Sequence, residues 1–163
     1  IKKAKDCIQD FSSNVELLVD NCEKTKFKDS TFNIVYGTGI LHHLNIKTCL
    51  EEIHRILKPG GKFLFIEPLG TNPLINIYRK CTPKSRSVDE HPLIGQDFEI
   101  IESKFTKMNV KYYGFLTLIF FSIYSSPKNS NIFKFLKKMD QFLFKFSIFK
   151  KLAWSVLIIA EKN

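Results

Sequence analysis

The clearest pattern of apolar and polar positions lies in residues 27–68. Residues 32–36 are apolar and rich in β-branched and aromatic side chains, which predicts a strand that ends at Gly37-Thr38-Gly39. Residues 47–57 carry apolar side chains at three- and four-residue spacing with charged residues between them, which predicts an amphipathic helix. The segment therefore begins as a strand, a glycine-containing loop and a helix.

This predicted helix is followed by Lys58-Pro59-Gly60-Gly61, a sequence typical of a helix end. Proline cannot continue a helix, and glycine readily adopts the left-handed conformation that closes one. Residues 63–66 are then continuously apolar over the length of a strand. The whole segment predicts a β-α-β unit in an α/β protein, with two parallel strands in a sheet covered on both faces.

The rest of the chain adds elements on both sides of this unit. Residues 1–11 show helical spacing, and a strand-like run at 14–19 precedes a polar loop at 20–26. Asn72 followed by Pro73 is typical of a helix N-terminus. Downstream of the unit, the pattern predicts helices at 74–80 and 95–105, and strands at 109–113 and 154–160.

Residues 132–149 predict a long amphipathic helix. Its apolar side consists of Ile132, Phe135, Leu136, Met139, Phe142, Leu143, Phe146 and Phe149. Its polar side consists of Lys134, Lys137, Lys138, Gln141 and Lys145. Two interpretations stay open, a lid packed on the domain and a surface helix that lies on lipid headgroups. The apolar run at 115–124 is too short to span a membrane, which takes about 20 residues.

Composition and charge narrow the class of protein. The chain has 163 residues, of which 44% are hydrophobic, so one domain with a sizeable core is expected. The net charge of +9 is uneven, because residues 71–163 carry 15 basic and 7 acidic side chains. Nucleic acid and an anionic membrane surface are candidate partners for such a region, and a solvated helix face is the plain alternative.

Cysteine and histidine, the residue types that often bind metals, do not occur at the spacing of a metal site in this chain. The four cysteines are far apart without a C-x-x-C motif, and His42 and His43 are adjacent, so they cannot share one face of a strand or helix. We therefore expect no metal site and reduced thiols in a cytoplasmic protein. The first residues also lack the apolar core of a secretory signal.

Several short motifs in the central segment occur in a specific order. They are Phe32-Asn33-Ile34-Val35, then Gly39-Ile40-Leu41-His42-His43-Leu44, then the stretch from Glu52 to Gly61, and finally Glu67-Pro68. In this order and spacing they resemble the second half of a class I S-adenosylmethionine-dependent methyltransferase domain. The resemblance is to the small-molecule group (methyltransferase type 11-like), which includes the quinone-biosynthesis methyltransferases.

The resemblance implies a Rossmann-like sheet that ends in an antiparallel hairpin. Residues 1–163 would form the C-terminal portion of one methyltransferase domain, with residues 114–151 as a helical insertion between the last two strands. The family's glycine-rich loop and acidic ribose ligand would precede this chain, which we expect to be truncated at its N-terminus. Gly37-Thr38-Gly39 follows a later strand and is not that glycine-rich loop.

The resemblance also assigns residues to the cofactor, S-adenosylmethionine. Asn21, or Asp20 after a one-residue shift, would contact the adenine together with the backbone of Cys22. A short polar residue after a strand is also common turn chemistry. The turn Gly37-Thr38-Gly39 would approach the methionine part of the cofactor, and it could equally be a tight strand-to-helix connection. Leu41, with Ile40, would line the adenosine side.

Three residues of the chain are candidates for a catalytic role. His42 and His43 are candidates for a general base because an ordinary histidine titrates near neutral pH, and they could instead orient the loop. Glu67, at the end of its strand, is a third candidate and could instead serve packing and hydrogen bonding.

The expected function is S-adenosylmethionine-dependent methyl transfer to a small, lipophilic acceptor, with this fragment inactive alone. The first alternative is a non-catalytic Rossmann-type module whose basic amphipathic helix serves a partner or a membrane surface. The second is methylation of nucleic acid. The chain lacks an Asn-Pro-Pro-Tyr-type motif after the central strand, which disfavours nucleic acid as a partner. Peripheral membrane contact would run through residues 132–149.

Overall fold

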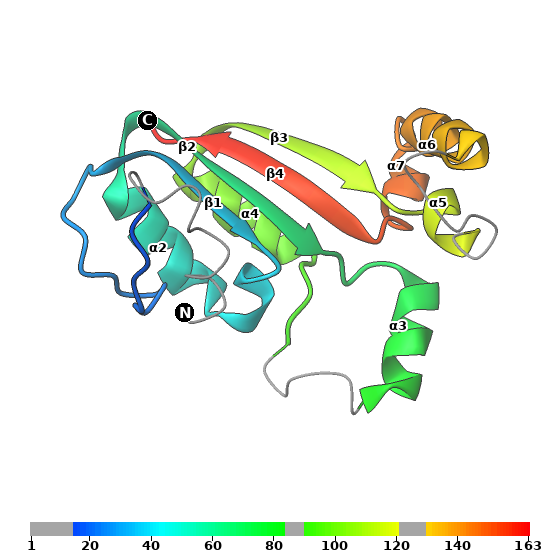
Figure 1. Cartoon of the computed structure of the whole chain (residues 1–163), viewed down its shortest axis with the longest axis horizontal. Helices are drawn as coiled ribbons and strands as arrows, with labels where there is room; N and C mark the ends of the chain where they lie inside the picture. Colours follow the sequence, from blue (N-terminus) through cyan, green and yellow to red (C-terminus); the bar gives the residue numbers. More distant parts are fainter. Residues whose placement is uncertain (1–14, 84–89, 121–129) are drawn as a thin grey trace.

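The computed structural model describes residues 15–83, 90–120 and 130–163. The helix expected at residues 1–11 lies outside these ranges. The elements in chain order are β1 (Phe32–Thr38), the 3-10 helix η2 (Leu41–His43), α2 (Ile46–Ile56), β2 (Leu57–Pro68), α3 (Pro73–Cys81), α4 (Gly95–Lys104), β3 (Thr106–Tyr113), α5 (Leu116–Ile119), α6 (Asn131–Leu143), α7 (Ser147–Lys150) and β4 (Ser155–Glu161) (Figure 1).

The described strands form one sheet in the order β1-β2-β4-β3. Strands β1 and β2 are parallel, as the β-α-β pattern predicts, and Tyr36 lies opposite Leu64 in the register. Strand β4 runs antiparallel to both β2 and β3. The expected antiparallel hairpin at the end of the sheet is therefore present, and α5, α6 and α7 lie within its connection. The carboxyl ends of β1, β2 and β3 consequently share one edge of the sheet.

Helix α2 begins after a polar capping residue, whereas β2 begins earlier than predicted. Asn45 precedes α2, and its side-chain Oδ1 accepts a hydrogen bond from the backbone N–H of Thr48 at 3.1 Å. The helix ends at Ile56, but β2 begins at once at Leu57 rather than near residue 63. The Pro-Gly-Gly segment is part of this strand because Gly60, with φ of +73°, donates its N–H to Lys162 O at 2.9 Å.

The hydrophobic core lies on one face of the sheet. Helices α2 and α4 contact each other on that face. Between them and the sheet lie the fully or almost fully buried side chains Leu50, Ile53, Phe63, Phe65, Ile101, Phe105, Val156 and Ile158. Alternate residues of β2 and β4 point into this core.

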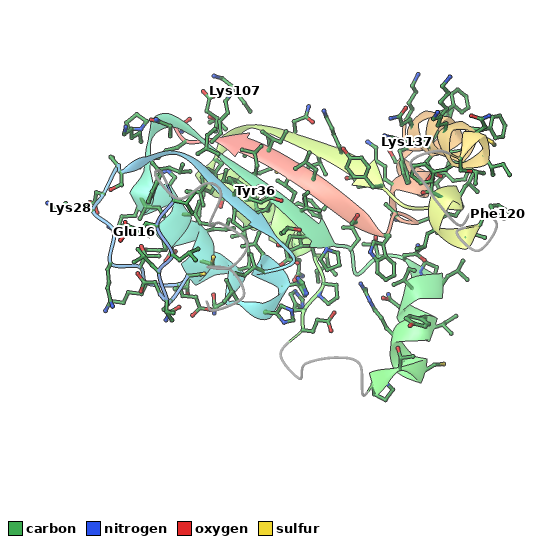
Figure 2. All side chains as sticks on the ribbon, viewed as in Figure 1. Glu16, Lys28, Tyr36, Lys107, Phe120 and Lys137 are labelled. Atoms are coloured by element: carbon green, nitrogen blue, oxygen red, sulfur yellow. The ribbon has the colours of Figure 1, made fainter. Side chains whose placement is uncertain are left out.

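The opposite face of the sheet is open in the described part of the chain. Ile34 and Tyr36 of β1 are 60% and 63% exposed, and Ile66 of β2 is exposed as well (Figure 2). The expectation of a sheet covered on both faces is therefore wrong for the described residues. Helices α2 and α4 lie on the other side of it.

Residues 15–19 do not form the strand expected at 14–19, and Asn14 lies outside the described ranges. Leu18 and Val19 are exposed. A strand needs a neighbour that pairs with its backbone groups. Within the described residues β1 pairs only with β2, and no strand lies beside residues 15–19. The apolar pattern there suits a strand, but no described strand pairs with it.

The end of the molecule beyond the sheet's carboxyl edge is built from short helices. Helix α3 begins after Asn72, whose Oδ1 accepts from the N–H groups of Leu74 and Ile75 at 3.0 and 3.2 Å, as the N-cap signal predicts. Thr71 Oγ1 donates to Lys151 O at 3.0 Å, which ties the start of α3 to the segment before β4. None of the described helices combines the length and the apolar character that crossing a membrane requires.

Candidate functional site

The predicted site residues gather where β1 and β2 end. Both strands are parallel, so the loop after Thr38 and the carboxylate of Glu67 meet at one edge of the sheet. Ligands of open α/β sheets bind in the crevice outside such an edge. The loop of residues 20–26, which carries the predicted adenine contacts, approaches this edge from the side of α2, against which it is bonded through Glu52.

Glu67 is the centre of the hydrogen-bond network at this edge. Its side chain is 1% exposed. Its Oε1 accepts from the N–H groups of Ile40 and Leu41, each at 3.0 Å. Its Oε2 lies 3.4 Å from the N–H of His42 and 2.8 Å from the ring Nδ1 of the same residue. A single buried carboxylate thus holds three consecutive residues of the loop, which is a positioning role rather than proton transfer to an acceptor.

His42 and His43 occupy different environments despite being neighbours. His42 is 7% exposed, and its backbone oxygen accepts from the N–H of His91 at 2.6 Å. The His42 Nδ1 faces the Glu67 carboxylate, so Nδ1 carries the proton and Nε2 carries the lone pair in the neutral ring. His43 is exposed, and its ring lies against that of His42 with centroids 4.0 Å apart. Any general base of this pair would act through Nε2 of His42 or through His43.

Two glycines of the turn after β1 are required by local geometry. A Cβ on Gly37 would lie 2.2 Å from Cε1 of the buried Phe65 ring, so no other residue fits there without moving the ring. Gly39 has φ of +60° and donates its N–H to Ile66 O at 2.8 Å. Thr38, between them, is exposed. The turn is therefore structurally demanded, and it also leaves its backbone accessible at the edge where a ligand would lie.

The predicted adenine-binding residues also shape their own loop. Asp20 accepts from the N–H groups of Lys26 and Asn21, each at 2.9 Å, and these bonds lower the pKa of Asp20 below its ordinary value. Asn21 Oδ1 accepts from the N–H of Glu23 at 2.9 Å. The turn chemistry that the sequence left open is therefore present at both positions. Asn21 remains exposed, and the structure gives no sign of a one-residue shift that would favour Asp20 over it.

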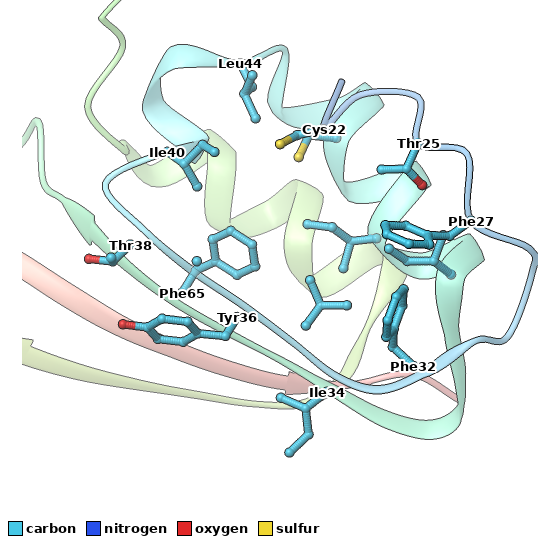
Figure 3. A pocket seen from close by; sticks show the side chains of 15 residues that line it. Cys22, Thr25, Phe27, Phe32, Ile34, Tyr36, Thr38, Ile40, Leu44 and Phe65 are labelled. Atoms are coloured by element: carbon cyan, nitrogen blue, oxygen red, sulfur yellow. The ribbon is translucent and has the colours of Figure 1, made fainter. Parts of the chain in front are cut away.

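An apolar cavity of about 350 Å³ separates the two loops. Of the residues predicted to bind the cofactor, Cys22 lines one side of the cavity, and Gly37 and Thr38 line the other (Figure 3). Its remaining wall is mostly aromatic and aliphatic, with Phe27, Phe32, Val35, Ile40, Leu44, Ile53 and Phe65 among the contributors. Of the predicted cofactor residues, Cys22, Gly37 and Thr38 line this cavity, whereas Asp20, Asn21 and Gly39 lie outside its lining.

Leu41 has a different place from the one expected. Its side chain is fully buried in the hydrophobic core, so it supports the loop from below. Ile40, which the sequence placed beside it, lines the cavity. Two consecutive residues of a turn point in different directions, and the apolar sequence alone could not tell which one faces inward.

A charged network that sequence reasoning missed attaches the loop of residues 20–30 to α2. Glu52 is 8% exposed and accepts from the N–H and Oγ1 of Thr25 at 2.8 and 2.5 Å. Arg55 donates to Glu52, to Asp29 at 2.6 Å and to Phe27 O at 2.8 Å. The bonds from Arg55 lower the pKa of Glu52 to about 2, and those to Glu52 raise the pKa of Arg55. The three-residue spacing of Glu52 and Arg55 on one helix was the available signal.

The remaining predictions concern metal binding and the cysteine thiols. Among the residues that the structure describes, no three metal-binding side chains come together. Cys22 and Cys81 are exposed, and Cys49 is buried, which raises the pKa of its thiol to about 12. Cys49 is therefore a packing residue, and the thiols are less uniformly buried than expected.

Comparison with known proteins finds similarity to methyltransferases. Residues 1–65 match the family described as "Methyltransferase domain". The chain is 37% identical over 63 residues to a sterol 4-C-methyltransferase of Caenorhabditis elegans, covering 38% of this chain and 19% of that protein. It is 42% identical over 85 residues to a mitochondrial 2-methoxy-6-polyprenyl-1,4-benzoquinol methylase of Dictyostelium discoideum, covering 51% of this chain and 26% of that protein. The chain thus spans about a quarter or less of the length of these relatives.

A solved structure extends the likeness to nearly the whole chain. An S-adenosylmethionine-dependent methyltransferase from Archaeoglobus fulgidus superposes with a TM-score of 0.59 and 14% sequence identity, covering 97% of this chain and 72% of that one. At this identity the likeness shows the fold. The Rossmann-like methyltransferase fold expected from the sequence is therefore confirmed. The chain therefore matches a methyltransferase domain in sequence over residues 1–65 and shares the fold of an S-adenosylmethionine-dependent methyltransferase over nearly its whole length.

Proposed function

We propose that the protein transfers a methyl group from S-adenosylmethionine to a small, lipophilic acceptor. The observation that carries this proposal is the loop of Ile40, Leu41 and His42, held by one buried carboxylate at the carboxyl edge of the sheet and facing an apolar cavity. The matches to methyltransferases support the reaction class.

The residues on this side of the site bind and orient rather than react. The cofactor supplies an electrophilic methyl group on a sulfonium, and the transfer needs the acceptor and that methyl to be held in line. The exposed backbone at Thr38 and Gly39 would hold the methionine part, and the 20–26 loop with Asn21 and Cys22 would hold the adenine. The cavity's aromatic and aliphatic wall suits the apolar surfaces of the adenosine.

A lipophilic acceptor is favoured by two observations. The relatives named above act, by their names, on a sterol and on a polyprenyl benzoquinol. On α3, which follows β2 at the site's edge of the sheet, Leu74, Ile77 and Tyr78 are exposed at helical spacing. Apolar side chains that gather beside a site suit an apolar substrate better than a charged one.

Isothermal titration calorimetry of the full-length protein with S-adenosylmethionine tests the cofactor, and a screen of quinols and sterols with labelled methyl donor tests the acceptor. We expect the 163-residue chain alone to bind the cofactor weakly, because the described residues form one wall of the site and leave Thr38 and Gly39 exposed. Binding as tight by the short chain as by the full-length protein would overturn that expectation.

The runner-up is a Rossmann-type module that binds a ligand without transferring a methyl group. Glu67 favours it, because its carboxylate is occupied by the backbone of the loop of residues 40–42 and by the His42 ring. A full-length protein that binds S-adenosylmethionine but turns over no acceptor in the presence of lipid would support this alternative.

A further inference from the structure

The sequence pattern predicts one apolar and one polar side for this helix, but helix α6 has three distinct sides. One side is turned toward the protein and includes the buried Leu136 and Asp140. A second side is formed by exposed lysines at positions 134, 137 and 138. The third side is apolar and exposed, with Ile132 48%, Phe135 62%, Met139 38% and Phe142 58% exposed, and Phe146 beyond the helix end 51% exposed.

Asp140 fixes which side faces outward. Its carboxylate is 4% exposed and accepts from the N–H groups of Phe115, Leu116 and Thr117 at 3.2, 2.8 and 3.2 Å, and from Thr117 Oγ1 at 2.7 Å. These donors include the N-terminal backbone groups of α5, which lack partners within that helix. Rolling α6 to bury its apolar side would break all four bonds. The exposed apolar side is therefore imposed by the fold.

We name the exposed set Ile132, Phe135, Met139, Phe142 and Phe146 the α6 stripe. Within it the Phe142 and Phe146 rings lie edge to face with centroids 5.8 Å apart, and Lys145 Nζ lies 5.8 Å from the Phe142 centroid. Among the described residues, no side chain covers the stripe. Large apolar side chains gathered at helical spacing on one exposed side mark an interaction surface.

The charge beside the stripe identifies the partner. Lys134, Lys137, Lys138 and Lys145 are exposed, and the helix's one acidic residue, Asp140, is buried against α5 (Figure 2). An exposed phenylalanine-rich side flanked by lysines is typical of helices that lie in the headgroup layer of anionic membranes. A second copy of this chain would bring the same lysines together, which disfavours self-association.

We propose that α6 lies flat on an anionic lipid bilayer, with the α6 stripe among the acyl chains and the lysines at the lipid phosphates. The helix has 13 residues and does not span the membrane. It follows β3 and α5, beyond the sheet edge where the candidate site opens (Figure 1). Contact at this end brings that edge to the membrane surface, where a lipophilic acceptor resides.

The inference goes beyond the proposed function and does not depend on it, because lipid binding is measured without cofactor or acceptor. Flotation of the full-length protein with phosphatidylcholine vesicles, with and without 30% phosphatidylglycerol, tests it. We expect flotation with the anionic vesicles and little with the neutral ones. We expect the double variant Phe135→Ser with Phe142→Ser to lower the partition coefficient by about tenfold or more. Lys134→Glu with Lys138→Glu should lower it by about fivefold per lysine or more.

Matched controls distinguish binding through the α6 stripe from nonspecific binding of the protein to vesicles. Val19→Ser removes an exposed apolar side chain outside the stripe. Lys28→Glu reverses a similarly exposed lysine, which lies at the opposite end of the molecule from α6 (Figure 2). Neither should change flotation by more than about twofold. The proposal fails if wild type does not float with anionic vesicles, or if the stripe variants float as well as wild type. It also fails if the stripe variants lose only a dimer in light scattering, which would make the stripe a self-association surface.

Discussion

The carboxylate oxygen Oε2 of Glu67 lies 2.8 Å from Nδ1 of His42, and the same carboxylate accepts from the backbone of the residues just before it. Both side chains are almost completely buried at the edge of the sheet. The ring and the backbone of the loop are therefore fixed by one group. This relationship makes Glu67 the residue on which the loop's geometry depends.

Glu67→Gln should loosen the loop. The amide cannot accept from all the donors that meet the carboxylate, and its own NH₂ would face N–H groups. We expect a loss of about 1–3 kcal/mol in the free energy of unfolding, since buried donors are left unpaired. Denaturant unfolding measures this. Glu51→Gln is the control, because Glu51 is half-exposed and pairs with Lys104 at the surface, and it should cost less than about 1 kcal/mol. Equal losses in the two variants would contradict the role given to Glu67.

His42→Asn separates positioning from base catalysis. If His42 orients the loop, the full-length enzyme should show a raised KM for S-adenosylmethionine and an unchanged dependence of kcat on pH. We expect about a 10-fold or larger rise in KM, which corresponds to about 1.4 kcal/mol of lost binding. Steady-state kinetics between pH 5.5 and about 8.5 give both readouts. Loss of the low-pH limb of the kcat profile with KM unchanged would make His42 the base.

Gly37→Ala should be destabilising although it is the smallest change available. The new Cβ would lie 2.2 Å from Cε1 of Phe65, so the ring or the strand must move, at about 1–3 kcal/mol. Thermal unfolding measures the effect, and Gly37→Ala with Phe65→Leu should recover part of it. Gly95→Ala is the matched control, since a Cβ there meets nothing within 4 Å, and it should be neutral or stabilise by up to about 1 kcal/mol. A stable Gly37→Ala protein would show that Phe65 is less firmly packed than described.

The contacts of Glu52 predict that the attachment of the loop of residues 20–30 to α2 weakens in acid. Its folded pKa of about 2 lies below its ordinary value of 4.5, chiefly because of Arg55. Its stabilisation is therefore fully present above about pH 5 and is lost as the pH falls from there toward 2. Glu52→Gln should cost about 1–3 kcal/mol at pH 7 and show a flatter dependence of stability on pH over that window.

Unfolding in urea at several pH values between about 3 and 7 measures the Glu52 effect. Glu102→Gln serves as the control, because Glu102 is an exposed residue of α4. The interpretation is wrong if the wild-type and Glu52→Gln curves stay parallel as the pH is lowered.

Asp140→Ala should detach α5 from α6. It removes the acceptor for four hydrogen bonds, and we expect about 1–3 kcal/mol of destabilisation together with faster proteolysis near residues 115–119. Limited proteolysis with mass spectrometry locates the first cuts. Asp29→Ala, which removes an exposed partner of Arg55, should leave cleavage at 115–119 unchanged.

The elements of the fold were predictable where local chemistry and burial agree. Helix α2, the N-cap Asn72 and strand β4 follow their apolar spacing and turn residues closely, and β2 does so from Phe63 onward. The run at 14–19 shows the limit of this reasoning, since its pattern suits a strand but a strand also needs a neighbour. The sequence placed Gly37, Gly39 and Glu67 at one edge of the sheet because these residues end neighbouring parallel strands, and their role toward the cofactor stays a prediction.

The amino-acid sequence was sufficient to predict the β-α-β unit and the edge of the sheet at which its glycine turn and Glu67 lie, because periodicity and turn residues act locally. The folded structure was needed to show which side of α6 faces outward, which of Ile40 and Leu41 lines the cavity, and that Glu67 is occupied by loop backbone. Each of these depends on a contact between segments distant in the chain, such as Asp140 with the start of α5. Periodicity shows that a side is apolar, and long-range hydrogen bonds determine whether it is buried.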